Sequence, residues 1–277
     1  MEKRRNQCWS GRKIITSANK KGGVSKTTTT VHLAHYGVDF LGLRVVLVDL
    51  DVQGPKSDRG NASSCFPGQP VILDASQLFE PCPENWRYEW EGEPEVRVIQ
   101  ANKRLVYAES YTGDVVDGTP LGIEVLQRPR EWLSRIDCDL IIIDTPPSSE
   151  VRLRAALVAS DSVLTPFTME SFSMDGMQAL YEEIHEVRAA FNPGLRLLGI
   201  LPTKLNPRSR KQRELYEAMV AQMPDMVIPA PTKDRAPVPE AIAEHRPVWR
   251  RVSGSSVRAA ADEMKASCKA IFERVKQ

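Results

Sequence analysis

Residues 19–30 read NKKGGVSKTTTT, a short stretch that combines two glycines with three lysines. It lies between an apolar run, KIITSA (13–18), and a stretch (28–42) whose apolar residues recur at steps of three and four, as in a helix. A glycine-containing loop between a strand and a helix is the setting of a phosphate-binding loop, where consecutive backbone N–H groups converge on phosphate oxygens. The usual pattern G-x-x-x-x-G-K-[ST], however, meets Lys20 and Ser25 at its two glycine positions. The sequence therefore predicts a nucleotide site with two departures from that pattern.

The other loop residues fit the roles that phosphate binding needs. Gly22 and Gly23 allow the backbone to approach a phosphate closely. Lys26 is placed to reach the β- and γ-phosphates, and the hydroxyl of Thr27 to ligate Mg²⁺. If the φ angle of Ser25 is positive, its side chain costs about 1–2 kcal/mol there. We expect ATP to bind more weakly than to a glycine version, although a Ser25 hydroxyl bonded to a phosphate would offset part of that cost.

Short apolar runs alternate with helical stretches along most of the chain. The runs are continuous rather than alternating, which is typical of strands that are covered on both faces in a parallel sheet. The sequence predicts a doubly wound α/β fold, with a mostly parallel sheet flanked by helices and ligands bound at the carboxyl ends of the strands. Predicted strands are 13–18, 44–51, 139–147, 161–167 and 196–203, and predicted helices are 28–42, 151–159, 175–190, 208–222 and 255–275.

We interpret residues 13–277 as a single domain that follows a flexible basic tail, residues 1–12. Residues 52–120 are the exception to the alternating pattern, because they are rich in proline and carry an acidic cluster. There we expect loops, a short helix at 76–79 and a strand at 96–100. Three aromatic residues of this region, Trp86, Tyr88 and Trp90, look exposed from their polar surroundings.

Composition narrows the class of protein. The 37 basic and 36 acidic residues nearly balance, so any nucleic-acid surface must be local. Five scattered cysteines form no C-x-x-C pair, which argues against a disulfide framework or a zinc site. No run of 18 apolar residues is present. These features indicate a soluble protein of a reducing cytoplasm.

Several motifs together resemble the deviant Walker A ATPases of the ParA/MinD family, which have the P-loop NTPase fold. The loop from Lys21 to Thr28 resembles K-G-G-x-G-K-[ST]-T, LVDLDVQG (47–54) resembles D-x-D-P-Q-G, and LIIIDTPPS (140–148) resembles the Walker B strand and switch. PFTMESFSMDG (166–176) resembles a further family segment. Residues 73–79, 199–215 and 241–249 are similar to plasmid partition ATPases, with the IncC-like branch nearest. The resemblance runs from about residue 13 to the end of the chain.

The resemblance implies a role for each matching residue. Lys21 is implied to cross a sandwich dimer and contact the partner's phosphates, and Asp51 to orient the attacking water. Asp144 is implied to hold Mg²⁺ through water, and Asp49 to hold either Mg²⁺ or the loop. The implied adenine pocket includes Asn206 and the turn at Pro229. The implied nucleotide-binding loop residues are Lys21, Gly22, Gly23, Val24, Ser25, Lys26, Thr27 and Thr28.

The resemblance also implies partners. It implies an ATP-dependent homodimer that binds DNA non-specifically and is released by slow hydrolysis, which a ParB-type centromere-binding partner stimulates. The protein would then be a bacterial, nucleoid-associated one. Basic residues are the candidates for DNA contacts because they neutralise phosphates without reading sequence. These residues are Arg208, Arg210, Lys211, Arg235 and Arg250.

Three other functions deserve comparison. In a nucleotide-locked binding protein, Ser25 and the altered switch, with Val52 in place of the family's proline, would have abolished turnover. A MinD-like membrane-cycling ATPase would need an amphipathic anchor at the C-terminus. One face of the last predicted helix is apolar, but packing against the sheet explains it better. A redox role like that of the nitrogenase iron protein would need paired cysteines, which the scattered set does not evidently provide.

Overall fold

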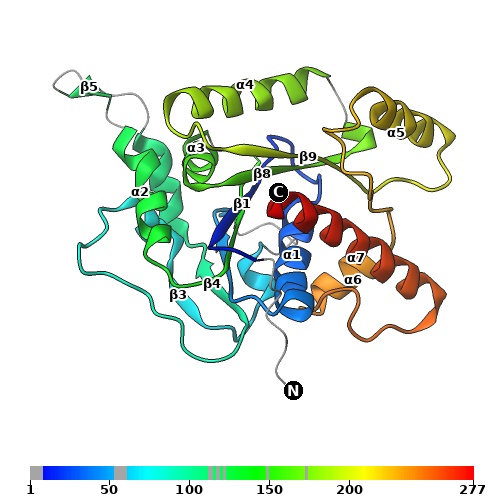
Figure 1. Cartoon of the computed structure of the whole chain (residues 1–277), viewed down its shortest axis with the longest axis horizontal. Coiled ribbons are helices and arrows are strands. Elements are labelled where there is room, and N and C mark those ends of the chain that lie inside the picture. Colours follow the sequence, from blue (N-terminus) through cyan, green and yellow to red (C-terminus); the bar gives the residue numbers. More distant parts are fainter. Residues whose placement is uncertain are drawn as a thin grey trace.

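A computed structural model describes residues 9–52, 61–111, 115–116, 119–120, 123–147, 150–171 and 174–277. Its centre is a parallel sheet in the order β3-β4-β2-β7-β1-β8-β9 (Figure 1). The strand order reverses direction around β1, which confirms the predicted doubly wound α/β fold. The strands of this sheet are β1 (Lys13–Ser17), β2 (Val45–Asp49), β3 (Val71–Asp74), β4 (Val96–Gln100), β7 (Leu140–Asp144), β8 (Ser162–Thr168) and β9 (Arg196–Thr203). A separate antiparallel pair joins β5 (Val115–Val116) to β6 (Thr119–Pro120).

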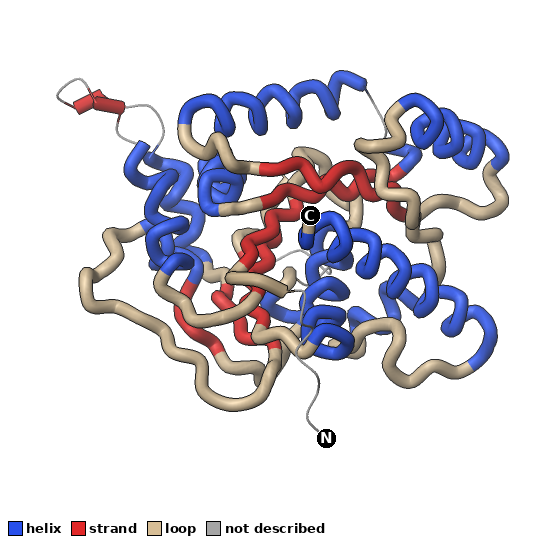
Figure 2. The backbone as a smooth tube through the Cα atoms, in the orientation of Figure 1, coloured by secondary structure: helices blue, strands red, loops and turns tan. Residues whose placement is uncertain are grey.

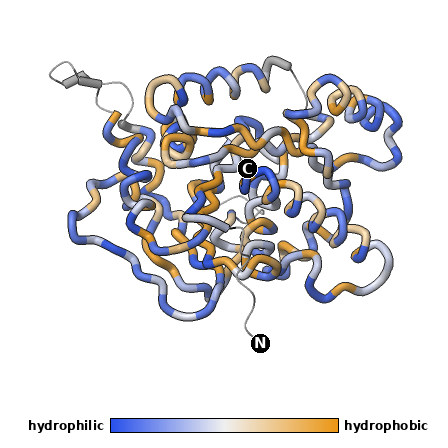
Figure 3. Tube along the Cα trace, in the orientation of Figure 1, coloured by the Kyte–Doolittle hydropathy of each residue, from blue (hydrophilic) through white to orange (hydrophobic). Residues whose placement is uncertain are grey.

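Helices cover both faces of the sheet (Figure 2). Alternate residues of each strand enter different cores: Ile141 and Ile143 of β7 pack on one side, and Leu140 and Ile142 on the other. Hydrophobic residues are frequent along the central strands and recur at intervals along the helices (Figure 3). The first core lies under α2 (Ile123–Ser134), α3 (Glu150–Ala159) and α4 (Met174–Ala190), and the second under α1 (Lys26–Leu41), α6 (Pro237–Ala243) and α7 (Gly254–Lys276).

A third, smaller core lies at the β9 edge of the sheet. There α5 (Arg210–Gln222) places Met219 against Phe167, Ile200 and Leu205. The predicted helices are all present within one or two residues of their expected bounds, which is the usual uncertainty at helix ends. Outside residues 52–120 the predicted strands and helices are therefore all present, although the sequence did not predict α2 and α6 there.

Within that region the prediction was partly right. The expected strand is β4, and the expected short helix is the 3₁₀ segment η2 (Ala75–Phe79). Further 3₁₀ segments are η1 (Ser63–Cys65) and η3 (Lys103–Tyr111), while η4 (Met169–Ser171) follows β8. The sequence did not predict β3 and η3 in this region, or α2 and α6 outside it. Their signals are weak, since β3 has four residues, α2 contains Pro129, and α6 has seven residues and begins at a proline.

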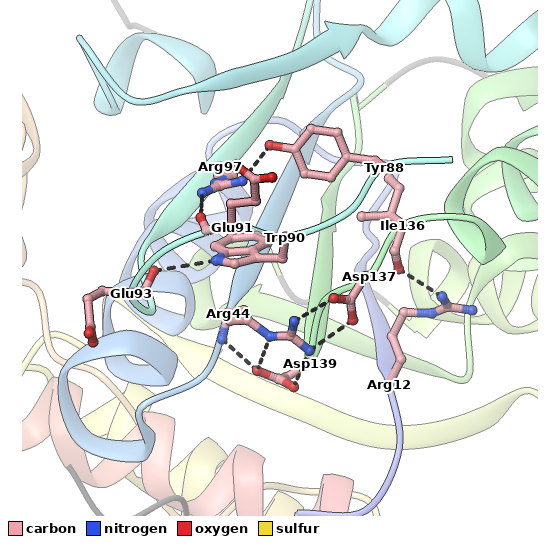
Figure 4. A network of polar contacts seen from close by, with 10 residues as sticks. All are labelled: Arg12, Arg44, Tyr88, Trp90, Glu91, Glu93, Arg97, Ile136, Asp137 and Asp139. Atoms are coloured by element: carbon pink, nitrogen blue, oxygen red, sulfur yellow. Dashed lines mark hydrogen bonds and ion pairs between the residues drawn. The ribbon is translucent and has the colours of Figure 1, made fainter. Parts of the chain in front are cut away.

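The aromatic residues of this region are more buried than predicted, and the expectation for Trp90 was wrong. Only 9% of Trp90 is exposed, because the Arg97 guanidinium lies 4.0 Å from its ring centroid. Arg97 also donates to the Tyr88 hydroxyl at 2.7 Å (Figure 4). Trp86 packs edge-on against Trp132 of α2, with ring centroids 4.7 Å apart. The segment 86–90 is therefore held against Arg97 of β4 and Trp132 of α2.

Ion pairs close the amino ends of the central strands. Arg44 precedes β2, and its guanidinium binds both Asp137, at 2.7 Å and 3.0 Å, and Asp139, at 3.1 Å (Figure 4). Arg12 precedes β1 and donates to the carbonyls of Ser134 and Ile136 at 3.0 Å, just beyond the end of α2. The side chains of Arg12 and Arg44 therefore occupy the amino edge of the sheet, and the opposite edge is formed by the carboxyl ends of the strands.

The apolar face of α7 packs into the protein. Met264, Cys268, Ile271 and Val275 are buried in the core beneath α1 and α7, as the sequence predicted. This packing argues against a membrane anchor on that face. Within the described ranges, no helix is both long and apolar enough to cross a membrane.

Candidate nucleotide site

A cavity of about 830 Å³ opens at the carboxyl edge of the sheet. Its floor is the loop between β1 and α1, and Asp51, just beyond β2, joins it. Residues 232–239 and the end of α6 form the opposite wall. The predicted residues that line the cavity are Gly22, Gly23, Ser25, Lys26, Thr27, Thr28 and Asp51.

The loop has the backbone geometry that phosphate binding requires. Gly23 and Ser25 both lie in the left-handed region, with φ of 78° and 69°. The hydroxyl of Thr203, at the end of β9, donates to the carbonyl of Val24 at 3.1 Å. Lys204 donates to the carbonyl of Gly23 at 3.1 Å. The end of β9 and the residue after it therefore hold the loop in place by hydrogen bonds to its backbone.

The positive φ of Ser25 is the condition under which the sequence predicted a cost. A side chain in this region is crowded against the backbone, and glycine is free of that penalty. The Ser25 side chain makes no capping hydrogen bond to α1, although it is the N-cap residue. Ser25 also lines the cavity.

Lys26 and Thr27 begin α1 and face the end of β7. The Thr27 hydroxyl donates to Asp144 Oδ2 at 2.6 Å, and the Lys26 ammonium donates to the carbonyl of Lys21 at 3.1 Å. Burial lowers the pKa of Lys26, and the charges of Asp144 and Asp51 oppose that shift. A buried cation, the N-terminus of a helix and two carboxylates thus meet in one place, which suits a bound polyphosphate with its metal.

Asp144 has the properties of a magnesium-site carboxylate. It is fully buried, and among the described residues no group hydrogen-bonds to its Oδ1. Burial, together with the charge of Asp49, raises its pKa to about 7. Mg²⁺ is usually held by one or two carboxylates with waters and substrate phosphates. Asp144 and Thr27 therefore fit Mg²⁺, and a cation there would keep the Asp144 carboxylate ionised.

Asp49 is bonded to the chain through both of its carboxylate oxygens. Both oxygens accept hydrogen bonds from the chain: Oδ1 from the Asp51 N–H at 3.0 Å, and Oδ2 from the Ser63 N–H at 2.7 Å and hydroxyl at 2.6 Å. These donors satisfy the carboxylate without a metal. Of the two roles that the resemblance left open, these hydrogen bonds favour holding the loop, and a role of Asp49 at the metal stays a prediction.

Asp51 is half-buried and lines the cavity. Burial raises its pKa, and the nearby charges of Lys26 and Arg152 act in the opposite direction. A carboxylate at this position, within the field of Lys26, fits the predicted role of orienting a water molecule.

The predicted adenine residues do not reach this cavity. The Asn206 side chain accepts from the Arg208 N–H at 2.9 Å in its own turn, and Pro229 is exposed. Neither is among the described residues that line the cavity, so their part in an adenine pocket stays a prediction. The wall at this end is formed by Thr232, Lys233, Asp234, Arg235, Val238 and Pro239. No motif marked these residues in the sequence, whereas Lys204 directly follows a predicted strand and could have been found.

The basic residues predicted to contact DNA divide into two groups. Arg208, Arg210 and Lys211 are exposed at the start of α5, where Arg210 pairs with Glu214 at 2.6 Å. Arg235 and Arg250 are engaged within the chain: Arg235 pairs with Glu263 at 2.8 Å, and Arg250 with Asp39 at 2.6 Å. The α5 group is the better candidate for an electrostatic surface, because Arg235 serves the cavity wall instead.

A parallel α/β sheet with this loop, Lys26, Thr27 and Asp144 defines a P-loop nucleotide-binding protein. The chain matches the AAA domain family over residues 12–197. It is 33% identical over 271 residues to protein IncC of Escherichia coli, covering 95% of this chain and 70% of IncC. It is 34% identical over 216 residues to the chromosome-partitioning ATPase Soj of Thermus thermophilus, covering 77% of this chain and 78% of Soj. The chain belongs to the ParA/MinD-type partition ATPases, in their IncC-like branch.

Solved structures share the fold. The ATP complex of a McdA variant from Cyanothece superposes with a TM-score of 0.70 at 18% identity, covering 96% of each chain. A plasmid partition protein of Borrelia burgdorferi bound to AMPPNP gives 0.68 at 20% identity, covering 95% of this chain and 98% of that one. Cobyrinic acid a,c-diamide synthase of Mycobacterium smegmatis, with an ATP analogue and magnesium, gives 0.64 at 26% identity, covering 80% and 87%.

The left-handed conformation of Ser25 leads to a prediction about affinity. Replacing Ser25 by glycine should tighten ATP binding by up to about tenfold, because glycine adopts this φ without the cost of a side chain. Equilibrium titration with ATP and Mg²⁺ measures the effect. Ser25→Ala is the matched control, since it keeps the Cβ and removes only the hydroxyl. Wild-type binding as tight as that of Ser25→Gly would contradict the prediction.

Proposed function

We propose that this protein is a partition ATPase that hydrolyses ATP with Mg²⁺ in the cavity at the carboxyl edge of the sheet. The observation that carries the proposal is the contact between Thr27 and Asp144, 2.6 Å long, next to the buried Lys26. This contact joins the phosphate loop to the Walker B strand at the point where a metal-bound nucleotide needs both. Membership of the ParA/MinD-type family supports the same activity.

In this proposal catalysis is positioning and electrostatics. The N–H groups that begin α1 and the Lys26 ammonium bind the phosphates. When Mg²⁺ is bound by Thr27 and Asp144, it neutralises phosphate charge. Asp51 orients the attacking water from the end of β2. The rate then depends on how firmly Asp51 is held, since misplacement by about 1 Å can slow a reaction about 100-fold.

Lys21 would complete the site of a second subunit. Its side chain is exposed at the rim of the loop, and within the described chain no acidic residue pairs with it. Its neighbour Lys20, by contrast, forms an ion pair with the buried Glu183 at 2.6 Å. A cation that is free to cross a dimer interface can act as an arginine finger does, and this makes hydrolysis depend on dimerisation.

The two adjacent lysines allow a matched test of this role. Lys21→Gln should lower ATP hydrolysis by about 100-fold or more while ATP still binds, because the lost cation acts only on phosphates in the partner. Lys20→Gln should keep hydrolysis within about threefold of wild type, since Arg154 still pairs with Glu183. Steady-state phosphate release, together with equilibrium ATP binding, measures both.

Equal effects of the two substitutions, or wild-type hydrolysis by Lys21→Gln, would rule out the role in trans. ATP binding by the wild type without any phosphate release, with or without a partner, would instead favour the nucleotide-locked switch.

We further propose that the ATP-bound dimer binds DNA non-specifically on the bacterial nucleoid, and that a ParB-type partner releases it by stimulating hydrolysis. The exposed basic residues at the start of α5 support the DNA contact, because Arg208 and Lys211 have no acidic partner among the described ion pairs. The family resemblance supports the partner.

The α5 surface can be tested by salt dependence. Arg208→Gln combined with Lys211→Gln should weaken ATP-dependent DNA binding, and should reduce the slope of log affinity against log salt by about 2. Lys265→Gln with Lys269→Gln is the control, since both residues lie on α7 beside acidic partners. An unchanged slope in the α5 variant would exclude this surface. No ATP-stimulated binding by the wild type at low salt would exclude DNA as a partner.

A further inference from the structure

Arg152 connects three segments that are distant in sequence. It lies on α3, which follows the Asp144 strand, and its side chain points toward the end of β2. Its Nη1 donates to the carbonyl of Leu50 at 2.7 Å, and its Nε donates to Glu109 Oε1 at 2.7 Å. Only 11% of the Arg152 side chain is exposed, against 33% for Glu109 of η3. Hydrogen bonds between charged groups that are shielded from water are stronger than those on an open surface.

The carbonyl that Arg152 binds belongs to the peptide group that leads into Asp51. The N–H of the same peptide group donates to Asp49 Oδ1 at 3.0 Å. Because a peptide group is planar and rigid, holding both its oxygen and its N–H restricts how the plane can turn. The Cα of Asp51 is bonded directly to that plane, so the two contacts limit the directions in which the Asp51 side chain can point.

The two side chains that bind this peptide group, Asp49 and Arg152, are each held by a residue from the region 61–111. On the nitrogen side, Asp49 is held by Ser63, whose hydroxyl also accepts from the Ala101 N–H at 3.1 Å, just beyond β4. On the oxygen side, Arg152 is held by Glu109 of η3. This loop-rich region, which lies outside the nucleotide motifs, therefore supports the peptide group that precedes Asp51.

We propose that Arg152, oriented by Glu109, is a positioning residue that sets the direction of the Asp51 carboxylate for ATP hydrolysis. This inference rests on the proposed ATPase function. Arg152 acts through the backbone of Leu50 and does not contact the nucleotide. Its loss should therefore slow the hydrolytic step and leave the binding of ATP, which depends on the loop and α1, nearly unchanged.

A purely structural arginine would behave differently. Replacing such an arginine would lower the thermal stability of the protein, and any loss of activity would follow the loss of folded protein. Arg154 is the matched control, because it lies on the same helix and also binds glutamates, Glu183 at 3.3 Å and Glu186. The glutamates that it binds belong to α4, whereas Arg152 binds Leu50 and Glu109.

The test measures single-turnover hydrolysis and ATP affinity for variants of the full chain at a temperature where each is folded. Arg152→Met should slow hydrolysis about tenfold or more while ATP affinity changes less than about threefold. Arg152→Lys should recover part of the rate, because one ammonium retains the charge but cannot reach both partners as the guanidinium does. Glu109→Gln should cause a smaller loss, and Arg154→Met should hydrolyse ATP at close to the wild-type rate.

A second readout is independent of activity. Amide hydrogen exchange in peptides covering residues 45–52 should become faster in Arg152→Met and stay unchanged in Arg154→Met. Unchanged exchange, or equal loss of hydrolysis in both variants, would overturn the positioning role. If the wild type hydrolyses no ATP, the proposed function fails, and the exchange measurement still decides whether Arg152 holds this segment.

Discussion

The site depends on the register of three neighbouring parallel strands. Asp144 at the end of β7 is paired with Ser17 of β1 on one side and with Asp49 of β2 on the other. Because these strands end level, the phosphate loop, the Asp51 segment and the Walker B carboxylate all emerge at the same edge. A slip of one residue in β7 would turn Asp144 toward the opposite face of the sheet. The hydrogen bond from Thr27 would then be lost, and with it the link between loop and metal carboxylate.

This register places two fully buried carboxylates side by side, and the chain satisfies them in different ways. Asp49 accepts three hydrogen bonds, which offset part of the cost of burying its charge, and burial raises its pKa to about 6. Asp144 accepts one, from Thr27, and burial raises its pKa to about 7. The first arrangement stabilises a loop, whereas the second suits a cation. The role that suits each carboxylate thus depends on how many hydrogen-bond donors it has, and not only on its position in a motif.

The sequence predicted the parts of the molecule that are encoded locally. Continuous apolar runs indicated the central strands because strands buried on both faces show that pattern directly. The loop, Lys26, Thr27 and Asp144 followed from short motifs. Contacts between distant segments were not predictable: Ser63 is 14 residues from Asp49, and Arg152 is 102 residues from Leu50. The cavity wall at residues 232–239 was missed for the same reason.

In the proposed mechanism the exposed Lys21 makes hydrolysis a property of two subunits rather than one. The rate of ATP hydrolysis per chain, with Mg²⁺ and saturating ATP, can be measured over a wide range of protein concentration. We expect the rate per chain to rise with concentration and to level off once the dimer predominates. A rate per chain that is constant over the whole range, while the protein changes from monomer to dimer, would contradict this mechanism.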